Sequence, residues 1–283
     1  MVTIGLIYDV LRWEERALIE SAKREDVNIK LIHIPSTHIY IYGEEHNISM
    51  DIGLQRCVSH QFALESTIAF EALGNRIVNN SYSIAVSNDK LWTTALLVKY
   101  NIPTPRIVIA FSQEQAYRAI EKLNYPVVIK PLNGSWGRLV SLARDEEELR
   151  TIIEHRTYMP SPIFKIHYIQ EFVKKPGRDI RAFVVGGEVP VAIYRISNHW
   201  ITNTARGGKA VPAKIDPELE ELVLRVAKII KGEILGIDVF EDPERGYLIN
   251  EVNSVTEFRN TVAATGYDLP RKIISYLVNL VKR

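Results

Sequence analysis

Three side chains that carry oxygen donors are expected to meet on one face of a hairpin near the end of the chain. The strand-like segments GIDVF and LINEVN are separated by DPERG, a turn sequence. A turn between residues 244 and 245 places Asp238 opposite Glu251, and Asn253 follows on the same face because side chains alternate along a strand. The same alternation predicts that Asn250 faces away from them.

This trio is typical of a site for a hard cation. Carboxylate and amide oxygens suit Mg²⁺, with substrate phosphates supplying further ligands. A solvated hairpin face with scattered polar residues is the alternative. The apolar neighbours Ile237, Val239 and Ile249 favour the metal interpretation, because an acidic group among them is costly unless it is paired or bound to metal.

A second segment, VVIKPLNGSWGR, combines a strand, a lysine and a glycine-containing loop. Lys130 ends the strand, and Gly134, Ser135 and Gly137 follow it. Glycines let the backbone approach a phosphate, and successive N–H groups cradle it. The loop matches neither the P-loop nor GxGxxG. An ordinary hairpin turn remains the alternative.

Two further groups of residues suggest recognition of a base and of anions. Gln170 and Glu171 in HYIQEFV lie at a strand end, where a purine ring would find backbone partners, although an ordinary edge strand also fits. Arg181 and Arg195 lie within strands and suit carboxylates or phosphates. Basic residues nearby include Arg206, which follows Asn203 in a loop, and two adjacent lysines interpreted as solvated, Lys174 and Lys175.

Composition excludes several other classes of function. Lys plus Arg is 35 and Asp plus Glu is 34, so the net charge of +1 gives no argument for nucleic acid or an anionic membrane. The lone Cys57 forms neither a disulfide within the chain nor a cysteine-based zinc site, and it is interpreted as a core residue rather than a nucleophile. No HExxH or GxSxG motif is present. With no secretory signal and no long apolar run, we expect a cytoplasmic protein.

The first third of the chain predicts an α/β unit. Apolar runs at 2–8, 29–34 and 51–57 predict strands, and the patterns at 11–24 and 61–73 predict helices. Strands alternating with helices favour a parallel sheet covered on both faces. The segment 36–50 has no clear period and is not assigned.

The remainder predicts a compact unit followed by an antiparallel α+β region. Ser87 and Asn88 are expected to cap a helix that ends near residue 100. The pattern over 106–156 predicts a small β-α-β-loop-β-α unit. Strand-like runs at 164–173, 179–187, 188–197, 234–241 and 247–252 follow, with helices at 216–230 and 269–283.

Taken in order along nearly the whole chain, these segments resemble the motifs of the ATP-grasp superfamily. The matching pieces are Lys90 in SNDK, VVIKP, NGSWGR, IQEFV, RDIRAFVV, the Asn203 loop, GIDVF and INEVN. The resemblance implies three subdomains with the nucleotide between two β-sheets: a pre-ATP-grasp domain at 1–87, a lid domain at 88–168 and an ATP-grasp domain at 169–283. Within the superfamily the chain is similar to the branch of ribosomal-protein glutamate ligases and LysW ligases.

A segment near the C-terminal end of the sequence is similar to one type of LysW ligase. EVNSVTEFRNTVAATG resembles the α-aminoadipate–LysW ligases (LysX type), in which Asn and Thr or Ser follow EF-R/K. The glutamate–LysW ligases (ArgX type) have Gly-Phe there. The pair Asn260-Thr261 therefore favours the first type.

The resemblance also implies a role for each matching residue. The phosphates of ATP would contact Lys90 and Lys130. The lid over them would consist of Gly134, Ser135, Trp136, Gly137 and Arg138. The adenine would be bordered by Gln170, Glu171 and Phe172, and the ribose would lie near Asp179. Asp238, Glu251 and Asn253 would hold two Mg²⁺ ions. Arg195 and Asn203 would steady the transferring phosphoryl group, Arg181 and Arg206 would bind carboxylates, and Asn260 and Thr261 would select the amino acid.

The implied activity is ATP-dependent amide formation in lysine biosynthesis. ATP would convert the C-terminal glutamate side chain of the small acidic carrier protein LysW to an acyl phosphate, and the α-amino group of 2-aminoadipate would attack it. A glutamate ligase, on LysW or of the ribosomal-protein type, is the alternative within this class, and a non-catalytic nucleotide-binding module is the alternative outside it. The relatives also suggest a homo-oligomer, with no nucleic-acid partner.

Overall fold

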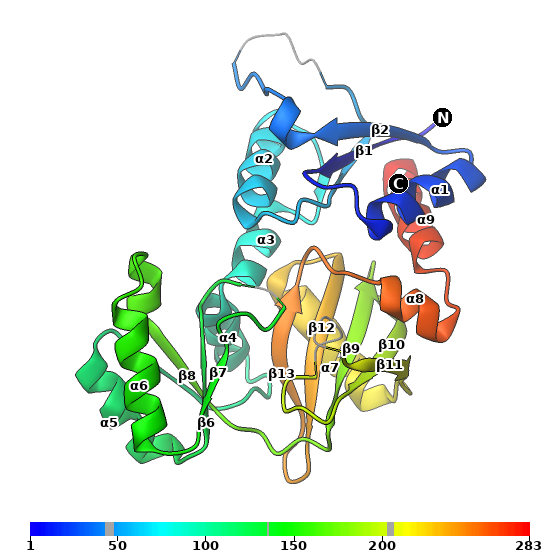
Figure 1. The fold of residues 1–283 in the computed structure, drawn as a ribbon. Coiled ribbons are helices and arrows are strands. Elements are labelled where there is room, and N and C mark those ends of the chain that lie inside the picture. Colours follow the sequence, from blue (N-terminus) through cyan, green and yellow to red (C-terminus); the bar gives the residue numbers. More distant parts are fainter. Residues whose placement is uncertain (43–47, 135, 203–206) are drawn as a thin grey trace.

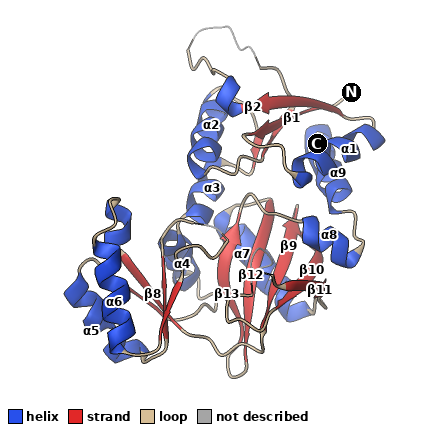
Figure 2. Ribbon diagram, viewed as in Figure 1, coloured by secondary structure: helices blue, strands red, loops and turns tan. Residues whose placement is uncertain are grey.

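Three β-sheets, each formed by a separate stretch of the chain, organise the computed structural model (Figures 1 and 2). It describes residues 1–42, 48–134, 136–202 and 207–283. The first sheet has the strand order β2-β1-β3-β4, the second β5-β8-β6-β7 and the third β11-β10-β9-β12-β13.

The first sheet is parallel, as the alternating pattern predicted. Its strands are β1 (Thr3–Tyr8), β2 (Asn28–His33), β3 (Ile52–Gln55) and β4 (Ile77–Val78), accompanied by the 3₁₀ helix η1 (Ile34–Ser36). Helix α1 (Trp13–Arg24) and helix α2 (His60–Ala72) connect them. Fully buried Ile4, Leu6 and Leu18 form part of its core. Such burial on both sides is typical of a parallel sheet.

The second sheet is antiparallel and carries two helices on one face (Figure 1). Its strands are β5 (Ile107–Ala110), β6 (Val127–Lys130), β7 (Ser141–Ala143) and β8 (His167–Glu171), with η2 (Pro162–Lys165) before the last of them. Helix α5 (Gln113–Leu123) and helix α6 (Glu146–Thr157) begin after the N-caps Ser112 and Asp145. The predicted compact unit is therefore present, but β8, which was expected in the antiparallel region that follows, lies in its sheet between β5 and β6.

The third sheet is antiparallel and is packed on both faces. Its strands are β9 (Arg178–Val185), β10 (Glu188–Ile196), β11 (Lys209–Pro212), β12 (Ile234–Asp242) and β13 (Gly246–Asn253). Val184 packs toward helix α7 (Pro217–Ile230), whereas Phe183 packs toward the first sheet and helix α9 (Leu269–Lys282). Alternation along β9 thus joins the sheet to two different cores. Figure 1 shows α9 beside α1, and the two helices are in contact.

The predicted capping of the helix before residue 100 is wrong. Ser87 and Asn88 belong to the last turn of helix α3 (Ser81–Asn88), which was not predicted. Asp89 caps helix α4 (Lys90–Lys99) instead, and its carboxylate accepts the backbone N–H of Trp92 at 2.9 Å. A second unpredicted helix, α8 (Arg259–Thr265), lies between β13 and α9. Within the described ranges, no helix has the length and apolar character needed to cross a bilayer.

Folding buries one imidazole whose protonation should make stability depend on pH. His167 on β8 is 1% exposed, and its Nδ1 lacks a hydrogen-bond partner among the described residues. Burial, reinforced by the charge of Arg156, lowers the pKa of His167 from 6.5 to about 4. Between these values the unfolded chain binds a proton that the folded chain does not, so stability falls as the pH falls through this window.

We predict that acidification from pH 6.5 to 4 removes about 3 kcal/mol of unfolding free energy through His167 alone. Urea unfolding at several pH values measures this slope, and His167→Gln should flatten it. His155→Gln, at an exposed position of α6, is the matched control. An equal slope in wild type and His167→Gln would contradict the assignment.

Candidate active site

Three adjoining cavities gather most of the predicted site residues. The inter-sheet cavity lies between the second and third sheets and contains Lys90, Lys130, Gly134, Gly137, Arg138, Gln170, Phe172, Asp179 and Glu251. The junction cavity contains Lys90, Gly134, Trp136, Arg181, Arg195, Glu251 and Asn253. The outer cavity contains Arg181, Arg195, Asn260 and Thr261. Ser135, Asn203 and Arg206 lie outside the described residues.

Lys130 is a buried cation on the wall of the inter-sheet cavity. Its ammonium donates to Gln170 Oε1 and to Asn250 Oδ1, each at 2.8 Å. Burial lowers the pKa of Lys130 to about 7, with Lys90 and Lys175 acting in the same direction and Glu251 opposing them. An added anion in the cavity would stabilise the charged form of this side chain.

The position of Asn250 corrects the predicted alternation along β13. The hairpin register pairs Asp238 with Glu251, as predicted, but the next pair is Val239 with Ile249. Asn250 is thus the extra residue of a β-bulge, which re-aims a side chain. Its amide faces the inter-sheet cavity together with Glu251 instead of pointing away.

Lys90 connects the glycine-containing loop to the hairpin. Its ammonium donates to the carbonyl of Gly134 at 3.1 Å and lies 3.2 Å from Glu251 Oε1. Gly134 has a φ of +144°, which a residue with a side chain rarely adopts. The loop backbone and two lysines therefore border one cavity, an arrangement suited to phosphate.

Two aspartates and two arginines form a buried cluster on the third sheet. Asp238 accepts from Arg181 at 2.7 and 2.9 Å, and its Oδ2 also lies 2.9 Å from Arg195. Arg195 donates to Asp179 Oδ1 at 2.6 Å. Burial raises the pKa of Asp238, but the two guanidinium groups outweigh this and hold it well below its usual range. Asp238 is absent from the lining of the cavities described above.

The interpretation of Lys175 as a solvated lysine is wrong. Its ammonium donates to Thr202 Oγ1 at 2.7 Å and to Asp179 Oδ2 at 3.3 Å, and it lies over the ring of Phe240. Only 11% of the side chain is exposed. Lys175 therefore adds a third lysine to the inter-sheet cavity.

Glu171 and Phe172 point in different directions from the end of β8. The carboxylate of Glu171 accepts from Arg106 at 2.7 Å and from Arg245 at 2.6 Å, which places it against the loops rather than in the cavity lining. Phe172 faces the cavity and meets Trp200 edge to face. Of the three residues predicted beside the adenine, the side chains of Gln170 and Phe172 line the cavity.

Trp136 places the glycine-containing loop beside the junction cavity. Its indole N–H donates to Glu257 Oε1 at 3.2 Å, and Arg138 stacks over its ring at 4.6 Å. Glu257 also accepts from Arg12, which precedes α1, at 3.2 Å. The glycine-containing loop and the N-terminal part of the chain therefore both donate hydrogen bonds to the carboxylate of Glu257.

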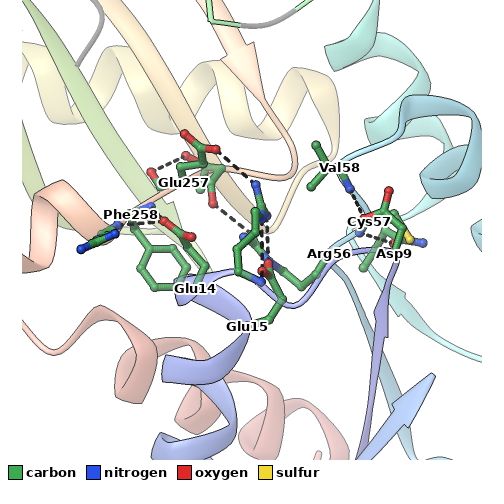
Figure 3. Close-up of polar contacts among 12 residues, drawn as sticks. Asp9, Glu14, Glu15, Arg56, Cys57, Val58, Glu257 and Phe258 are labelled. Atoms are coloured by element: carbon green, nitrogen blue, oxygen red, sulfur yellow. Dashed lines mark hydrogen bonds and ion pairs between the residues drawn. The ribbon is translucent and has the colours of Figure 1, made fainter. Parts of the chain in front are cut away.

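The outer cavity is built on α8 and on residues that the sequence analysis missed. Besides Asn260 and Thr261, it is lined by Arg12, Trp13, Glu14, Ile193, Glu257, Arg259 and Ala263. Glu14 Oε1 accepts the backbone N–H groups of Phe258 and Arg259 at 3.2 and 3.1 Å (Figure 3). It thus caps α8, whose own N-cap residue Phe258 offers no side-chain acceptor.

One feature of the sequence indicates that residues near Arg12 could belong to a binding site. Arg12 to Glu15 follow the first parallel strand, and ligands of α/β sheets bind beyond the carboxyl ends of the strands. Nothing in the local sequence pairs Glu14 with residues more than 240 positions away.

The oxygen donors fit a hard cation in their chemistry. Glu251 and Asn253 line the same cavity, and 24% of the Glu251 side chain is exposed. Carboxylate and amide oxygens are ligands that Mg²⁺ accepts. Over the described part of the chain, no group of three or more His, Cys, Asp or Glu side chains could hold a metal ion.

Cys57 is 1% exposed, as its interpretation as a core residue required. Burial, with the nearby charge of Asp9, raises the pKa of its thiol. A thiol that stays protonated is a poor nucleophile.

Comparison with known proteins agrees with this architecture. A model described as "RimK-like ATP-grasp domain" matches residues 87–277, and one described as "LysX preATP-grasp domain" matches residues 4–86. The chain is 45% identical to the α-aminoadipate–LysW ligase LysX of Sulfurisphaera tokodaii over 284 residues, covering 99% of both chains. It is 36% identical to the glutamate–LysW ligase ArgX of the same organism over 279 residues, covering 97% of both.

A solved structure supports the fold. The crystal structure of a RimK domain protein ATP-grasp from Sphaerobacter thermophilus superposes with a TM-score of 0.80 at 21% identity, covering 97% of this chain and 99% of the other. The predicted ATP-grasp fold and the predicted resemblance are both confirmed. The chain therefore belongs to the RimK-like ATP-grasp family of ligases, with a LysX preATP-grasp domain at its N-terminal end.

Proposed function

We propose that this protein is an ATP-dependent ligase that joins the α-amino group of 2-aminoadipate to the C-terminal glutamate side chain of the carrier protein LysW. The observation that carries the proposal is the similarity to LysX over the full length of both chains, which exceeds the similarity to ArgX. Asn260 and Thr261 at the outer cavity point the same way.

The chemistry explains why ATP is needed. A carboxylate has no good leaving group, whereas its acyl phosphate does. Transfer of the terminal phosphoryl group of ATP to the carrier carboxylate therefore precedes attack by the amine. Because an acyl phosphate hydrolyses in water, the site must also be covered during the reaction.

The inter-sheet cavity is our assignment for ATP. Lys90, Lys130 and Lys175 offer positive charge for phosphates, and the backbone around Gly134 offers close approach. Gln170, which is bonded to Lys130, and Phe172 line the same cavity, and we assign them to the adenine ring. Asp179, which also lines this cavity, would be near the ribose.

Glu251 and Asn253 are our assignment for binding Mg²⁺. Asp238 is the third predicted ligand, and binding metal would require it to share its oxygens with Arg181 and Arg195. Two bound Mg²⁺ ions would neutralise charge on the phosphates. Arg181 and Arg195 reach the junction cavity and would stabilise charge there without a metal.

The outer cavity is our assignment for the amino acid. Arg12 and Arg259 face it and suit the two carboxylates of 2-aminoadipate. Thr261 is buried and Asn260 is exposed on the same short helix, α8. The side chains at these two positions therefore set the depth and the polarity of the outer cavity.

We predict that Glu251→Ala lowers ATP-dependent amide formation by about 10²–10³-fold while the protein remains folded. The substitution removes a metal oxygen and the partner of Lys90. Phosphate release in the presence of both substrates measures the loss, and circular dichroism checks the fold. Glu244→Gln, on the exposed turn of the same hairpin, is the control. Undiminished ligation by folded Glu251→Ala would exclude Glu251 as a metal ligand.

We also predict that Asn260→Gly combined with Thr261→Phe shifts preference from 2-aminoadipate towards glutamate. A phenyl ring at 261 fills the space that the longer substrate needs, and a change of one methylene is worth about 10–200-fold in discrimination. Competition between the two amino acids, with mass spectrometry of the LysW product, reads out the ratio. An unchanged ratio would refute this selection by residues 260 and 261.

A further inference from the structure

Four residues line both the junction cavity and the outer cavity: Arg12, Arg181, Arg195 and Glu257. Under the proposed function, activation of the carrier takes place on the junction side, and the amino acid occupies the outer side. The reacting amine must therefore lie where the two cavities meet. An ammonium group placed there faces three arginines and a single carboxylate.

The other nearby carboxylates are committed elsewhere. Glu14 is 5% exposed, and it accepts two backbone N–H groups at the start of α8. Glu251 lines the junction cavity but not the outer one, and it pairs with Lys90. Glu257 also accepts two bonds on its Oε1, but 40% of its side chain is exposed, so this carboxylate has room for a ligand.

A rigid frame holds Glu257 in place (Figure 3). Arg12 donates to Glu257 Oε1, and two bonds of 3.1 and 2.9 Å tie the Arg12 guanidinium to Glu15. Glu15 in turn pairs with buried Arg56 at 2.9 Å, and Arg56 donates to the carbonyl of Thr256, next to Glu257 in the chain. On the other side, Trp136 donates to the same Oε1. A carboxylate oriented in this way meets the geometric demand on a base.

We propose that Glu257 binds the α-ammonium group of the amino acid and acts as the catalytic base that makes it a nucleophile. This proposal rests on the proposed function. Glu257 accepts one proton from the ammonium, which frees the nitrogen lone pair. The nitrogen attacks the acyl carbon and forms the C–N bond. The C–O bond to phosphate then breaks, with its electron pair leaving on phosphate.

The protons balance in this sequence. The nitrogen loses two protons in all: the first goes to Glu257 and the second to the departing phosphate. Glu257 then releases its proton to solvent, which restores the enzyme. The products are the amide, hydrogen phosphate and one proton.

The charged and titratable groups that face Glu257 come from several elements. They are Arg12 and Glu14 at the start of α1, His60 on α2, Lys90 on α4, Arg181 on β9, Arg195 on β10, Glu251 on β13 and Arg259 on α8. Most of them are cationic, and Glu257 is the carboxylate that both cavities share.

The test separates activation of the carrier from attack by the amine. Wild type and Glu257→Gln are each supplied with LysW, ATP and Mg²⁺, and then with either hydroxylamine or 2-aminoadipate. Hydroxylamine is largely unprotonated at neutral pH and traps the acyl phosphate as a hydroxamate without a base. Glutamine keeps an oxygen that accepts from Arg12 and Trp136, so the frame is preserved. Glu244→Gln is the matched control.

We expect Glu257→Gln to retain most of its hydroxamate formation and to lose amide formation by about 10²–10⁴-fold. Its kcat should fall, its KM for 2-aminoadipate should rise and its KM for ATP should stay unchanged. The residual rate of Glu257→Gln should rise tenfold per pH unit, because only the free amine reacts. The rate of the wild type should depend less steeply on pH. Glu257→Asp should be faster than Glu257→Gln.

Three results would overturn the proposal. These are normal amide formation by Glu257→Gln, equal loss of hydroxamate and amide, and an aspartate variant no faster than the glutamine variant. If wild type forms neither product, the proposed function itself fails and the role of Glu257 fails with it. If wild type forms both and Glu257→Gln matches it, only the role of Glu257 fails.

Discussion

The pairing of charges buried inside the third sheet is the constraint on which the site depends. Arg195 is 2% exposed and lies between Asp179 and Asp238. Removing an ion from water costs several kcal/mol, and only close partners offset that cost. Cross-strand neighbours supply these partners: Arg195 is opposite Asp179, and Asp238 is opposite Arg181. A slip of one residue would separate the charges, so this pairing favours the observed register.

The same register places the cavities relative to one another. Arg181 and Arg195 lie at the boundary of the junction and outer cavities, while Asp179 faces the inter-sheet cavity. A second buried pair, Glu15 with Arg56, ties the N-terminal sheet to the loop after β13. Burial raises the pKa of Glu15, but Arg56 and Arg12 outweigh this and lower it. Two sheets formed by separate stretches of the chain are thereby held against one site.

The sequence predicted those parts of the site that follow from local rules. Alternation and a short turn placed Asp238 opposite Glu251, and the helices expected at 216–230 and 269–283 are present as α7 and α9. Asn250 was misplaced because a β-bulge adds a residue without a local signature. Helix α8 was missed because it has seven residues and takes its cap from Glu14, far away in the sequence. Lys175 was misjudged because its partner Thr202 lies on another segment.

The charge at the cavity junction also constrains how an amino acid can enter. Under the proposed function, its carboxylates would be attracted to Arg12 and Arg259, whereas its ammonium group would be repelled by every nearby guanidinium. Glu257 is a partly exposed carboxylate that lines both cavities, so an orientation with the nitrogen toward Glu257 pairs opposite charges. That orientation also points the amine at the side where the carrier is activated. Under the proposed function, the charges that bind the amino acid would therefore also align its amine for attack on the activated carrier.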